Sequence, residues 1–341
     1  MADSKAQKGI ERLLFETGAI RVAPENKPFW YTSGALGPYY SNTQNLIGGE
    51  AEANGLLAQI DDWLNGNRLL LPSKIIRHIV NAYNTNTCYR SVAGYIKSCI
   101  KENIDIDGVD IISGGARRDW FFSYITAYMF NKPHITIFKD QSMAASAPFG
   151  GKKLVDTENS GAAVAVRGGT EETAAIVRGG AEAASAVAVR GGAEAEAQAV
   201  AVRDGALRGM RCLHVSDIIT TASSYEKSWA PALIKAGTRI HTSLTILDRM
   251  QGGAAVLESL GIRHVSVARL DRGFFGRALK QGYIDGTQYE MLLGYIDNPD
   301  AAMRTFINNN PNFLKDALSA GGKEAERARM CIDSGIYAAG V

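Results

Sequence analysis

Hydrophobic positions along the chain follow two spacings, one typical of short strands and one typical of amphipathic helices. Segments with the pattern of short strands occur at residues 109–112, 135–138, 212–215, 239–247 and 265–268. In most cases a short polar or glycine-containing loop comes next, followed by a helical pattern. Strands that alternate with helices over short connections predict a parallel sheet with helices on both faces. We therefore expect an α/β fold that binds its ligands beyond the carboxyl ends of the strands.

Other patterns flank this alternation. Residues 8–17 have the spacing of a short amphipathic helix, and helical patterns dominate residues 50–103. The segment 29–42 combines aromatic residues with glycine and proline, which predicts two short extended pieces around a turn, here called the hood segment. The predicted organisation is an N-terminal helix with the hood segment (1–48), a first part of the core (49–160), an insertion (161–206), a second part of the core (207–270) and a C-terminal helical extension (271–341).

The insertion at 161–206 has an unusual composition. It contains 16 alanines and 8 glycines among 46 residues, with no aromatic residue and no proline. Four near-repeats of Val-Arg-Gly-Gly type place arginines at positions 167, 178, 190 and 203. Alternating alanine and valine before paired glycines predicts short strands joined by tight turns. The alanine- and glutamate-rich run at 193–198 would suit a helix equally well, so the helix remains the alternative.

Composition and charge narrow the class of protein. The 341 residues are 46% hydrophobic and carry a formal net charge of +2, which suits a folded enzyme or a structural protein. We expect no nucleic-acid partner, because the whole chain is nearly neutral and the insertion has four arginines against six acidic residues.

The sequence shows no pattern typical of a membrane span, a signal peptide or a metal site. No run reaches the roughly 18 apolar residues of a membrane span, so we expect no membrane association. The N-terminus lacks an apolar signal core, which predicts a cytoplasmic protein. The four cysteines are widely spaced, and the five histidines show no ligand spacing. We therefore expect no metal held by protein side chains alone.

The strongest chemical signal lies at residues 213–224. An apolar strand leads to Asp217, and the small residues from Thr220 to Ser224 follow and open a helix. Backbone N–H groups in such a turn, with the positive end of a helix behind them, suit a phosphate group. Asp217 could accept hydrogen bonds from sugar hydroxyls. The alternative is an ordinary loop whose serines and threonines cap a helix.

This segment resembles the signature of the type I phosphoribosyltransferases, in which a strand, two acids and two apolar residues precede a Thr-Thr-Gly-Ser-Thr-like loop. The resemblance implies that the loop holds the 5-phosphate of phosphoribosyl pyrophosphate (PRPP) and that Asp217 holds its ribose. The implied loop residues are Thr220, Thr221, Ala222, Ser223 and Ser224. Two departures are visible. Ser216 replaces the first acid but can still offer the ribose a hydroxyl, and Ala222 replaces a glycine, which is unfavourable if φ is positive there.

Two further segments resemble the orotate phosphoribosyltransferase branch of this family. The hood segment resembles F-x-L-K-S-G-x-x-S-P-Y-F, with matches at Phe29, Ser33, Gly34, Pro38 and Tyr39. Residues 247–253 resemble a D-R-x-x-G-G segment whose arginine contacts orotate, which implies that Arg249 binds the base. The resemblance covers residues 8–48, 105–145 and 207–270. It implies orotate as the acceptor, Mg²⁺ bound through PRPP, and a homodimer.

The remaining predicted contacts concern pyrophosphate. Ser113, Gly114, Gly115 and Arg117 lie where the family has its pyrophosphate loop, in which glycine lets the backbone approach an anion and Arg117 or Arg118 neutralises charge. Lys139 matches a catalytic lysine of the family. The alternatives are solvated arginines at a helix start and an ordinary surface lysine.

The lysine-rich catalytic loop of the family, expected soon after Lys139, is missing. Only Lys152 and Lys153 could supply its cations before the insertion begins. Either these lysines and the insertion rebuild the loop, or catalysis is impaired. The sequence thus predicts a phosphoribosyltransferase that uses PRPP and orotate. The alternative is a non-catalytic regulatory protein of the same fold that binds PRPP or a nucleotide.

Overall fold

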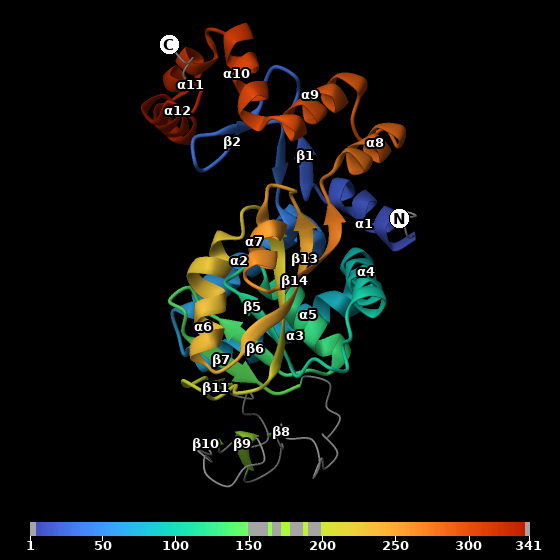
Figure 1. The fold of residues 1–341 in the computed structure, drawn as a ribbon, viewed down its shortest axis with the longest axis vertical. Helices are drawn as coiled ribbons and strands as arrows, with labels where there is room; N and C mark the ends of the chain where they lie inside the picture. Colours follow the sequence, from blue (N-terminus) through green and yellow to red (C-terminus); the bar gives the residue numbers. More distant parts are fainter. Residues whose placement is uncertain (1–4, 149–162, 166–171, 178–186, 190–198, 338–341) are drawn as a thin grey trace. The chain divides into compact units, whose positions relative to one another are not determined.

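The computed structural model describes residues 5–148, 163–165, 172–177, 187–189 and 199–337 (Figure 1). Contacts along the chain divide it into two compact units. The first unit contains the residues up to Leu13 together with Thr43–Arg269, and the second contains Leu14–Asn42 together with the residues from Leu270 onward. The predicted boundaries place the hood segment and the C-terminal extension in separate regions, whereas the structure groups them in one unit.

The first unit is built on a seven-stranded sheet with the order β11-β7-β6-β5-β12-β13-β14. The five strands from β6 to β14 in this order are parallel, while β7 pairs antiparallel with β6, and β11 antiparallel with β7. The predicted parallel core is confirmed, and the antiparallel edge extends it. The strands are β5 (Ile111–Gly115), β6 (His134–Ile137), β7 (Met143–Ser146), β11 (Val200–Ala201), β12 (Arg211–Ile219), β13 (Arg239–Asp248) and β14 (Arg263–Arg269).

Helices cover both faces of this sheet, as predicted. The chain steps in one direction from β5 through α5 to β6, and in the opposite direction from β12 through α6 and α7 to β14. Because such crossovers are right-handed, α5 and α6 lie on opposite faces, as Figure 1 shows. The helical elements are α1 (Lys5–Glu16), η1 (Thr43–Ile47), α2 (Glu50–Leu64), η2 (Arg68–Leu70), α3 (Leu71–Thr85), α4 (Thr87–Asn103), α5 (Trp120–Phe130), η3 (Tyr225–Trp229), α6 (Ala230–Lys235) and α7 (Gly253–Ser259).

The order of the strands reverses between β5 and β12. Such a switch point opens a crevice at the carboxyl ends of the two strands, where α/β proteins bind ligands. The central position of α5 explains its sequence, since all its residues from Trp120 to Ala127 are buried. It packs against β5 and β12 on one side and against α3 and α4 on the other, so it is apolar all round.

The second unit combines the hood segment with five helices. Its strands are β1 (Ile20–Val22), β2 (Phe29–Trp30), β3 (Leu36–Gly37) and β4 (Tyr39–Ser41), and β2 pairs with β3 as the predicted extended pieces. Trp30 stacks on Phe313, and the backbone N–H of Leu36 donates to the Tyr337 hydroxyl at 2.8 Å. The helices are α8 (Arg272–Lys280), α9 (Gly286–Asp297), α10 (Pro299–Asn309), α11 (Phe313–Ala320) and α12 (Gly322–Ser334).

Four pieces of the insertion belong to the described residues. Residues 199–206 contain β11, which pairs with β7 at the edge of the seven-stranded sheet. The other three are β8 (Ala163–Ala165), β9 (Glu172–Val177) and β10 (Val187–Val189), which form an antiparallel sheet with β9 in the centre. The run at 193–198 lies outside the described residues, and the repeat as a whole stays a prediction. Within the described part of the chain, no helix is both long and apolar enough to cross a membrane.

Candidate functional site

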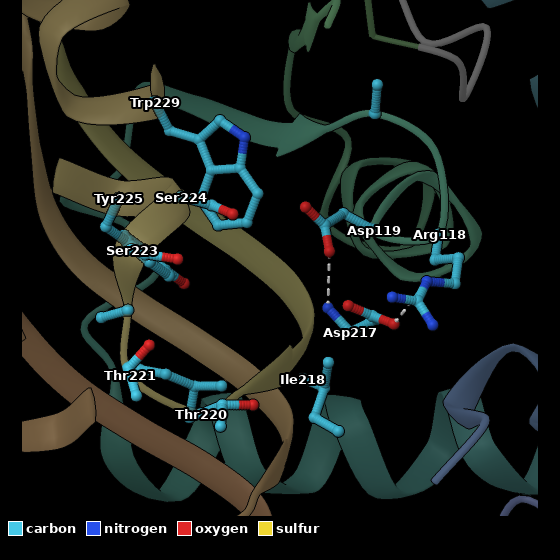
Figure 2. Close-up of a pocket in the computed structure, with 13 residues that line it drawn as sticks. Arg118, Asp119, Asp217, Ile218, Thr220, Thr221, Ser223, Ser224, Tyr225 and Trp229 are labelled. Carbon is cyan, nitrogen blue, oxygen red and sulfur yellow. Dashed lines mark hydrogen bonds and ion pairs between the residues drawn. The ribbon is translucent and has the colours of Figure 1, made fainter. Parts of the chain in front are cut away.

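A cavity of about 200 Å³ lies at the switch point. Its lining comes from the loop after β5, from the end of β12 and from the turn that follows β12 (Figure 2). The sequence predicted five of these residues in the turn and one carboxylate on the strand. The lining residues are Ala116, Arg118, Asp119, Asp217, Ile218, Ile219, Thr220, Thr221, Ala222, Ser223, Ser224, Tyr225 and Trp229.

The turn after β12 leads directly into the start of a helix. A helix begins at Ser223 and continues through the π-helical turn η3 into α6. The first N–H groups of a helix have no partner within it, and the helix dipole makes this end positive. A hydrogen bond holds the start of the turn against α7, since the N–H of Gly253 donates to the Thr220 carbonyl at 2.9 Å. Backbone donors, hydroxyls and a positive helix end therefore converge on one cavity.

Ala222 adopts the left-handed backbone conformation, which is unfavourable for a residue that replaces the glycine of the motif. Its φ is +59°, in a region that costs a residue with a side chain about 1–2 kcal/mol. Its methyl group is buried in a core cluster that includes Ile219 and Tyr225. Burial of this methyl offsets part of the backbone strain, so the loop keeps a glycine-like shape without glycine.

Asp217 lies at the edge of this cavity, on the last part of β12. Its side chain is 7% exposed, and Oδ2 accepts a hydrogen bond from the Thr43 hydroxyl at 2.8 Å. The Nε atom of Arg118 lies 3.4 Å from the same oxygen. The carboxylate is thus held on one side by two donors, beside the turn that would hold a phosphate.

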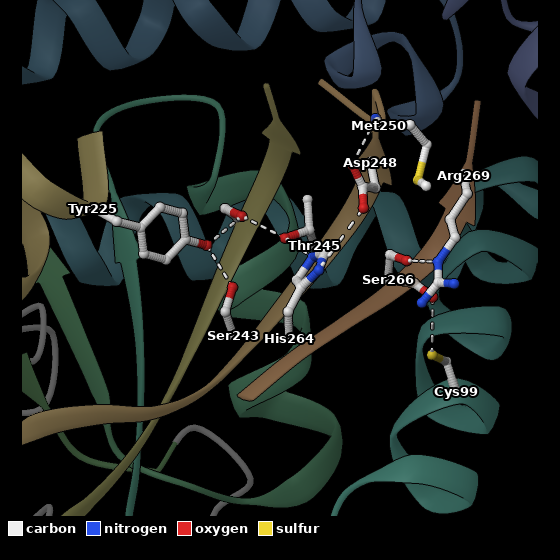
Figure 3. Close-up of polar contacts among 10 residues, drawn as sticks. Cys99, Tyr225, Ser243, Thr245, Asp248, Met250, His264, Ser266 and Arg269 are labelled. Atoms are coloured by element: carbon white, nitrogen blue, oxygen red, sulfur yellow. Dashed lines mark hydrogen bonds and ion pairs between the residues drawn. The ribbon is translucent and has the colours of Figure 1, made fainter. Parts of the chain in front are cut away.

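Ser216 lies elsewhere, and the predicted ribose contact of its hydroxyl is wrong for this structure. Successive side chains of a strand point to opposite faces, so Ser216 points away from the side that Asp217 occupies. It is fully buried, and its hydroxyl hydrogen-bonds the hydroxyls of Tyr225 at 2.8 Å and Thr245 at 3.2 Å. Figure 3 shows that this network continues from Thr245 to His264. Ser216 therefore supports the helix that follows the turn.

Of the two neighbouring arginines, Arg118 lines the cavity and Arg117 does not. Arg117, the predicted pyrophosphate contact, forms an ion pair with Asp61 of α2 and does not line the cavity. Arg118 lines it instead. The direction of each side chain follows from the backbone of the loop, which the sequence pattern does not specify.

The other predicted pyrophosphate residues belong to β5 and lie behind the cavity lining. The Ser113 hydroxyl is buried and hydrogen-bonds Nδ1 of His214 at 2.8 Å. A Cβ atom on Gly114 would lie 2.3 Å from Oγ of Ser123, and one on Gly115 would lie 2.3 Å from Nε1 of Trp229. Close packing therefore requires both glycines, which accounts for them without any bound anion.

Lys139 and Arg249 lie at the same edge of the sheet as the cavity but do not line it. Lys139 is exposed, two residues beyond the end of β6. Arg249 follows β13 directly, and its N–H donates to the Ile219 carbonyl at 3.0 Å, which places its backbone beside the turn. The catalytic role of Lys139 and the base contact of Arg249 stay predictions.

Asp119 is a site residue that the sequence analysis missed. It is 3% exposed, lines the cavity, and accepts the backbone N–H of Asp217 at 2.8 Å. Burial and the nearby Asp217 carboxylate raise the pKa of Asp119 well above its usual range. In the sequence, an aspartate just before an apolar helix reads as a cap, so no local signal pointed to the cavity.

These features give an α/β fold with a buried carboxylate and a turn of small residues beside each other at the switch point. In sequence, the chain is similar to an orotate phosphoribosyltransferase. The orotate phosphoribosyltransferase of Saccharolobus solfataricus is 28% identical over 90 residues, which are 26% of this chain and 45% of that protein. The match thus spans less than half the length of that relative. No family model matches the chain.

Solved structures with similar folds carry related names. The UMP synthase of Leishmania donovani has a TM-score of 0.44 and 13% identity, over 86% of this chain and 43% of that one. The orotate phosphoribosyltransferase of Aeropyrum pernix has a TM-score of 0.41 and 15% identity, over 79% of this chain and 98% of that one. Both TM-scores lie below 0.5.

Proposed function

We propose that this protein is a phosphoribosyltransferase, which transfers ribose 5-phosphate from PRPP to a nitrogen base and releases pyrophosphate. The observation that carries the proposal is the cavity at the switch point, where Asp217 and the turn from Thr220 to Ser224 meet. One ligand that joins a phosphate to a ribose would engage both features at once. The sequence similarity to an orotate phosphoribosyltransferase supports the same activity.

Each part of the donor then has a partner. The 5-phosphate accepts hydrogen bonds from the N–H groups and hydroxyls of the turn, with the positive helix end behind them. The carboxylate of Asp217 accepts hydrogen bonds from the ribose hydroxyls. Arg118, rather than Arg117, lies where it can neutralise charge on the pyrophosphate, because it reaches the cavity from the loop after β5.

The reaction needs little proton transfer from the protein. When the bond to pyrophosphate breaks, positive charge develops on the ribose, so positioning and charge neutralisation supply most of the rate enhancement. Mg²⁺ bound to PRPP would neutralise the leaving pyrophosphate. Within the described residues no group of three or more metal-ligating side chains occurs, whereas the carboxylates of Asp119 and Asp217 line the cavity. Such a pair fits Mg²⁺ held mainly by substrate oxygens.

We propose orotate as the acceptor. Arg249 supports this choice because its backbone is joined to the end of β12, next to the turn. A guanidinium group pairs well with a carboxylate, which orotate has and uracil lacks. We also expect the enzyme to be a homodimer, which light scattering would measure.

A second candidate is a protein that binds PRPP or a nucleotide without turning it over. Among the described residues that line the cavity, Arg118 is the one cation, and the predicted catalytic Lys139 is not in this lining. Lys152 and Lys153, the candidates for a rebuilt catalytic loop, lie outside the described residues. This alternative predicts affinity without product.

One assay separates the candidates. The purified protein is incubated with PRPP, Mg²⁺ and orotate, and both pyrophosphate and the nucleotide product are measured, with uracil and adenine as alternative acceptors. The enzyme is expected to form pyrophosphate with orotate and at least about tenfold less with uracil. PRPP binding without pyrophosphate would favour the regulator, and failure to bind PRPP would contradict both candidates.

A further inference from the structure

The two strands that border the cavity separate before they end. The pairing of β5 with β12 extends only to Ser113 and His214, although β5 pairs with β6 as far as Gly115 and β12 pairs with β13 as far as Ile219. Backbone N–H groups that face the gap therefore lose their partners in the sheet. A buried N–H without an acceptor is costly, so something must satisfy them.

The carboxylate of Asp119 satisfies one such group on each strand. Its Oδ2 accepts the N–H of Gly115 on β5 at 3.1 Å, and its Oδ1 accepts the N–H of Asp217 on β12 at 2.8 Å. Figure 2 shows Asp119 beside Asp217 at the side of the cavity. One buried side chain thus replaces the missing rungs between the strands and sets the width of the gap.

The cavity has two halves that depend differently on this link. Asp217 and the turn from Thr220 to Ser224 both belong to β12 and the residues that follow it, so one continuous segment of backbone connects them. Ala116 and Arg118 follow β5 and form the other half. Asp119 is hydrogen-bonded to the backbone of both halves, so we expect its loss to change mainly the spacing between them.

We propose that Asp119 is a positioning residue that holds the two halves of the PRPP site at the spacing that the donor requires. This inference rests on the proposed function, because it assigns the ribose 5-phosphate to the β12 half and the pyrophosphate to the β5 half. A buried carboxylate next to a second one is unfavourable, and the raised pKa of Asp119 reflects that cost. Its two hydrogen bonds from backbone N–H groups offset part of the cost.

The test compares two ligands on one variant. PRPP spans both halves, whereas ribose 5-phosphate contacts only the β12 half. In Asp119→Asn the amide oxygen can accept one N–H, and the NH₂ group then faces the second donor. We expect PRPP, with Mg²⁺, to bind at least about tenfold more weakly, since small misplacements of bound groups have effects of this size. Ribose 5-phosphate should bind within about threefold of the wild type. Calorimetry measures both affinities.

Asp110 offers a matched control. Its Oδ2 accepts the N–H of Arg211 at 2.7 Å, so it also joins the β5 and β12 regions through the backbone, but at the opposite end of the two strands. Asp110→Asn should leave both affinities unchanged. If Asp119→Asn does not fold, Asp119→Glu keeps the charge and both acceptors but lengthens the side chain, and the same selective loss of PRPP is expected.

The outcomes distinguish the inference from the function on which it rests. Equal losses for the two ligands, or unchanged PRPP affinity, would overturn the positioning role while wild-type binding still supported the proposed function. A wild-type protein that binds neither ligand would overturn both.

Discussion

The turn from Thr220 to Ser224, which is proposed to bind the 5-phosphate, is packed against Gly253, and this contact provides a sharp test of the site. A Cβ atom at this position would lie 2.7 Å from the Thr220 carbonyl oxygen and 2.6 Å from Cγ1 of Ile219. The Ile219 side chain can rotate, but the carbonyl belongs to the backbone at the start of the turn. The φ of Gly253 is not in the left-handed region, so an alanine here is unfavourable because of the contact alone.

The magnitude follows from these distances. Real Cβ atoms keep at least 3.0 Å from other heavy atoms, so Thr220 and residue 253 would have to separate by about 0.3 Å or more. Overpacking of this kind costs about 1–3 kcal/mol. The hydrogen bond from the Gly253 N–H to the Thr220 carbonyl would weaken as well, at a cost of up to about 1 kcal/mol. We expect Gly253→Ala to lower the free energy of unfolding by about 1–4 kcal/mol.

The displaced turn should also bind PRPP about tenfold more weakly or worse. Urea unfolding measures the stability, and calorimetry with PRPP and Mg²⁺ measures the affinity. Gly55→Ala and Gly94→Ala are matched controls, since both glycines are exposed within helices and a Cβ there meets nothing within 4 Å. The controls should gain about 0.5–1 kcal/mol and keep their affinity. A Gly253→Ala protein with wild-type stability and affinity would refute the packing argument.

Three further results are expected. Ala222→Gly should change the free energy of unfolding by less than about 1 kcal/mol in urea, because relief of the positive φ is offset by a lost buried methyl and a more flexible unfolded chain; a loss above 2 kcal/mol would contradict this. In calorimetry, Arg118→Ala should weaken PRPP binding at least about tenfold and Arg117→Ala less than about twofold, and the reverse order would restore the original prediction. Burial lowers the pKa of His134 and His214 to about 3, so the unfolded chain binds more protons below pH 6.5. Stability should therefore fall as pH falls from 6.5 towards 3, by about 1.4 kcal/mol per pH unit for each histidine, and urea unfolding that does not change between pH 7.5 and 5.5 would contradict it.

Local patterns were sufficient to predict the elements that carry the site. The apolar run before Asp217 and the small residues after it correctly indicated a strand, a turn and a helix, because each signal lies within a dozen residues. The alternation of side chains along the strand also predicts that Ser216 and Asp217 point to opposite faces, although the family motif groups these two positions together. Since Ser216 and Asp217 are neighbours on one strand, only one of them can face the cavity.

The parts of the site that could not be predicted depend on contacts across the sheet. Asp119 acts because β5 and β12 separate, and nothing near it in the sequence records that separation. The choice between Arg117 and Arg118 depends on the path of a loop, and Asp61 of α2, which pairs with Arg117, is far away in the sequence. The hood segment was predicted correctly as extended pieces, but its grouping with the C-terminal helices comes from packing between distant segments.

The central claim is that the cavity at Asp217 binds PRPP, and calorimetric titration of the wild type and Asp217→Asn with PRPP and Mg²⁺ tests it most directly. The variant keeps the shape of the side chain but loses a charge whose hydrogen bonds are worth about 1.5–3 kcal/mol. The account predicts saturable binding by the wild type and an affinity at least about tenfold lower for the variant. Absence of binding by the wild type, or equal affinities for the two proteins, would contradict it.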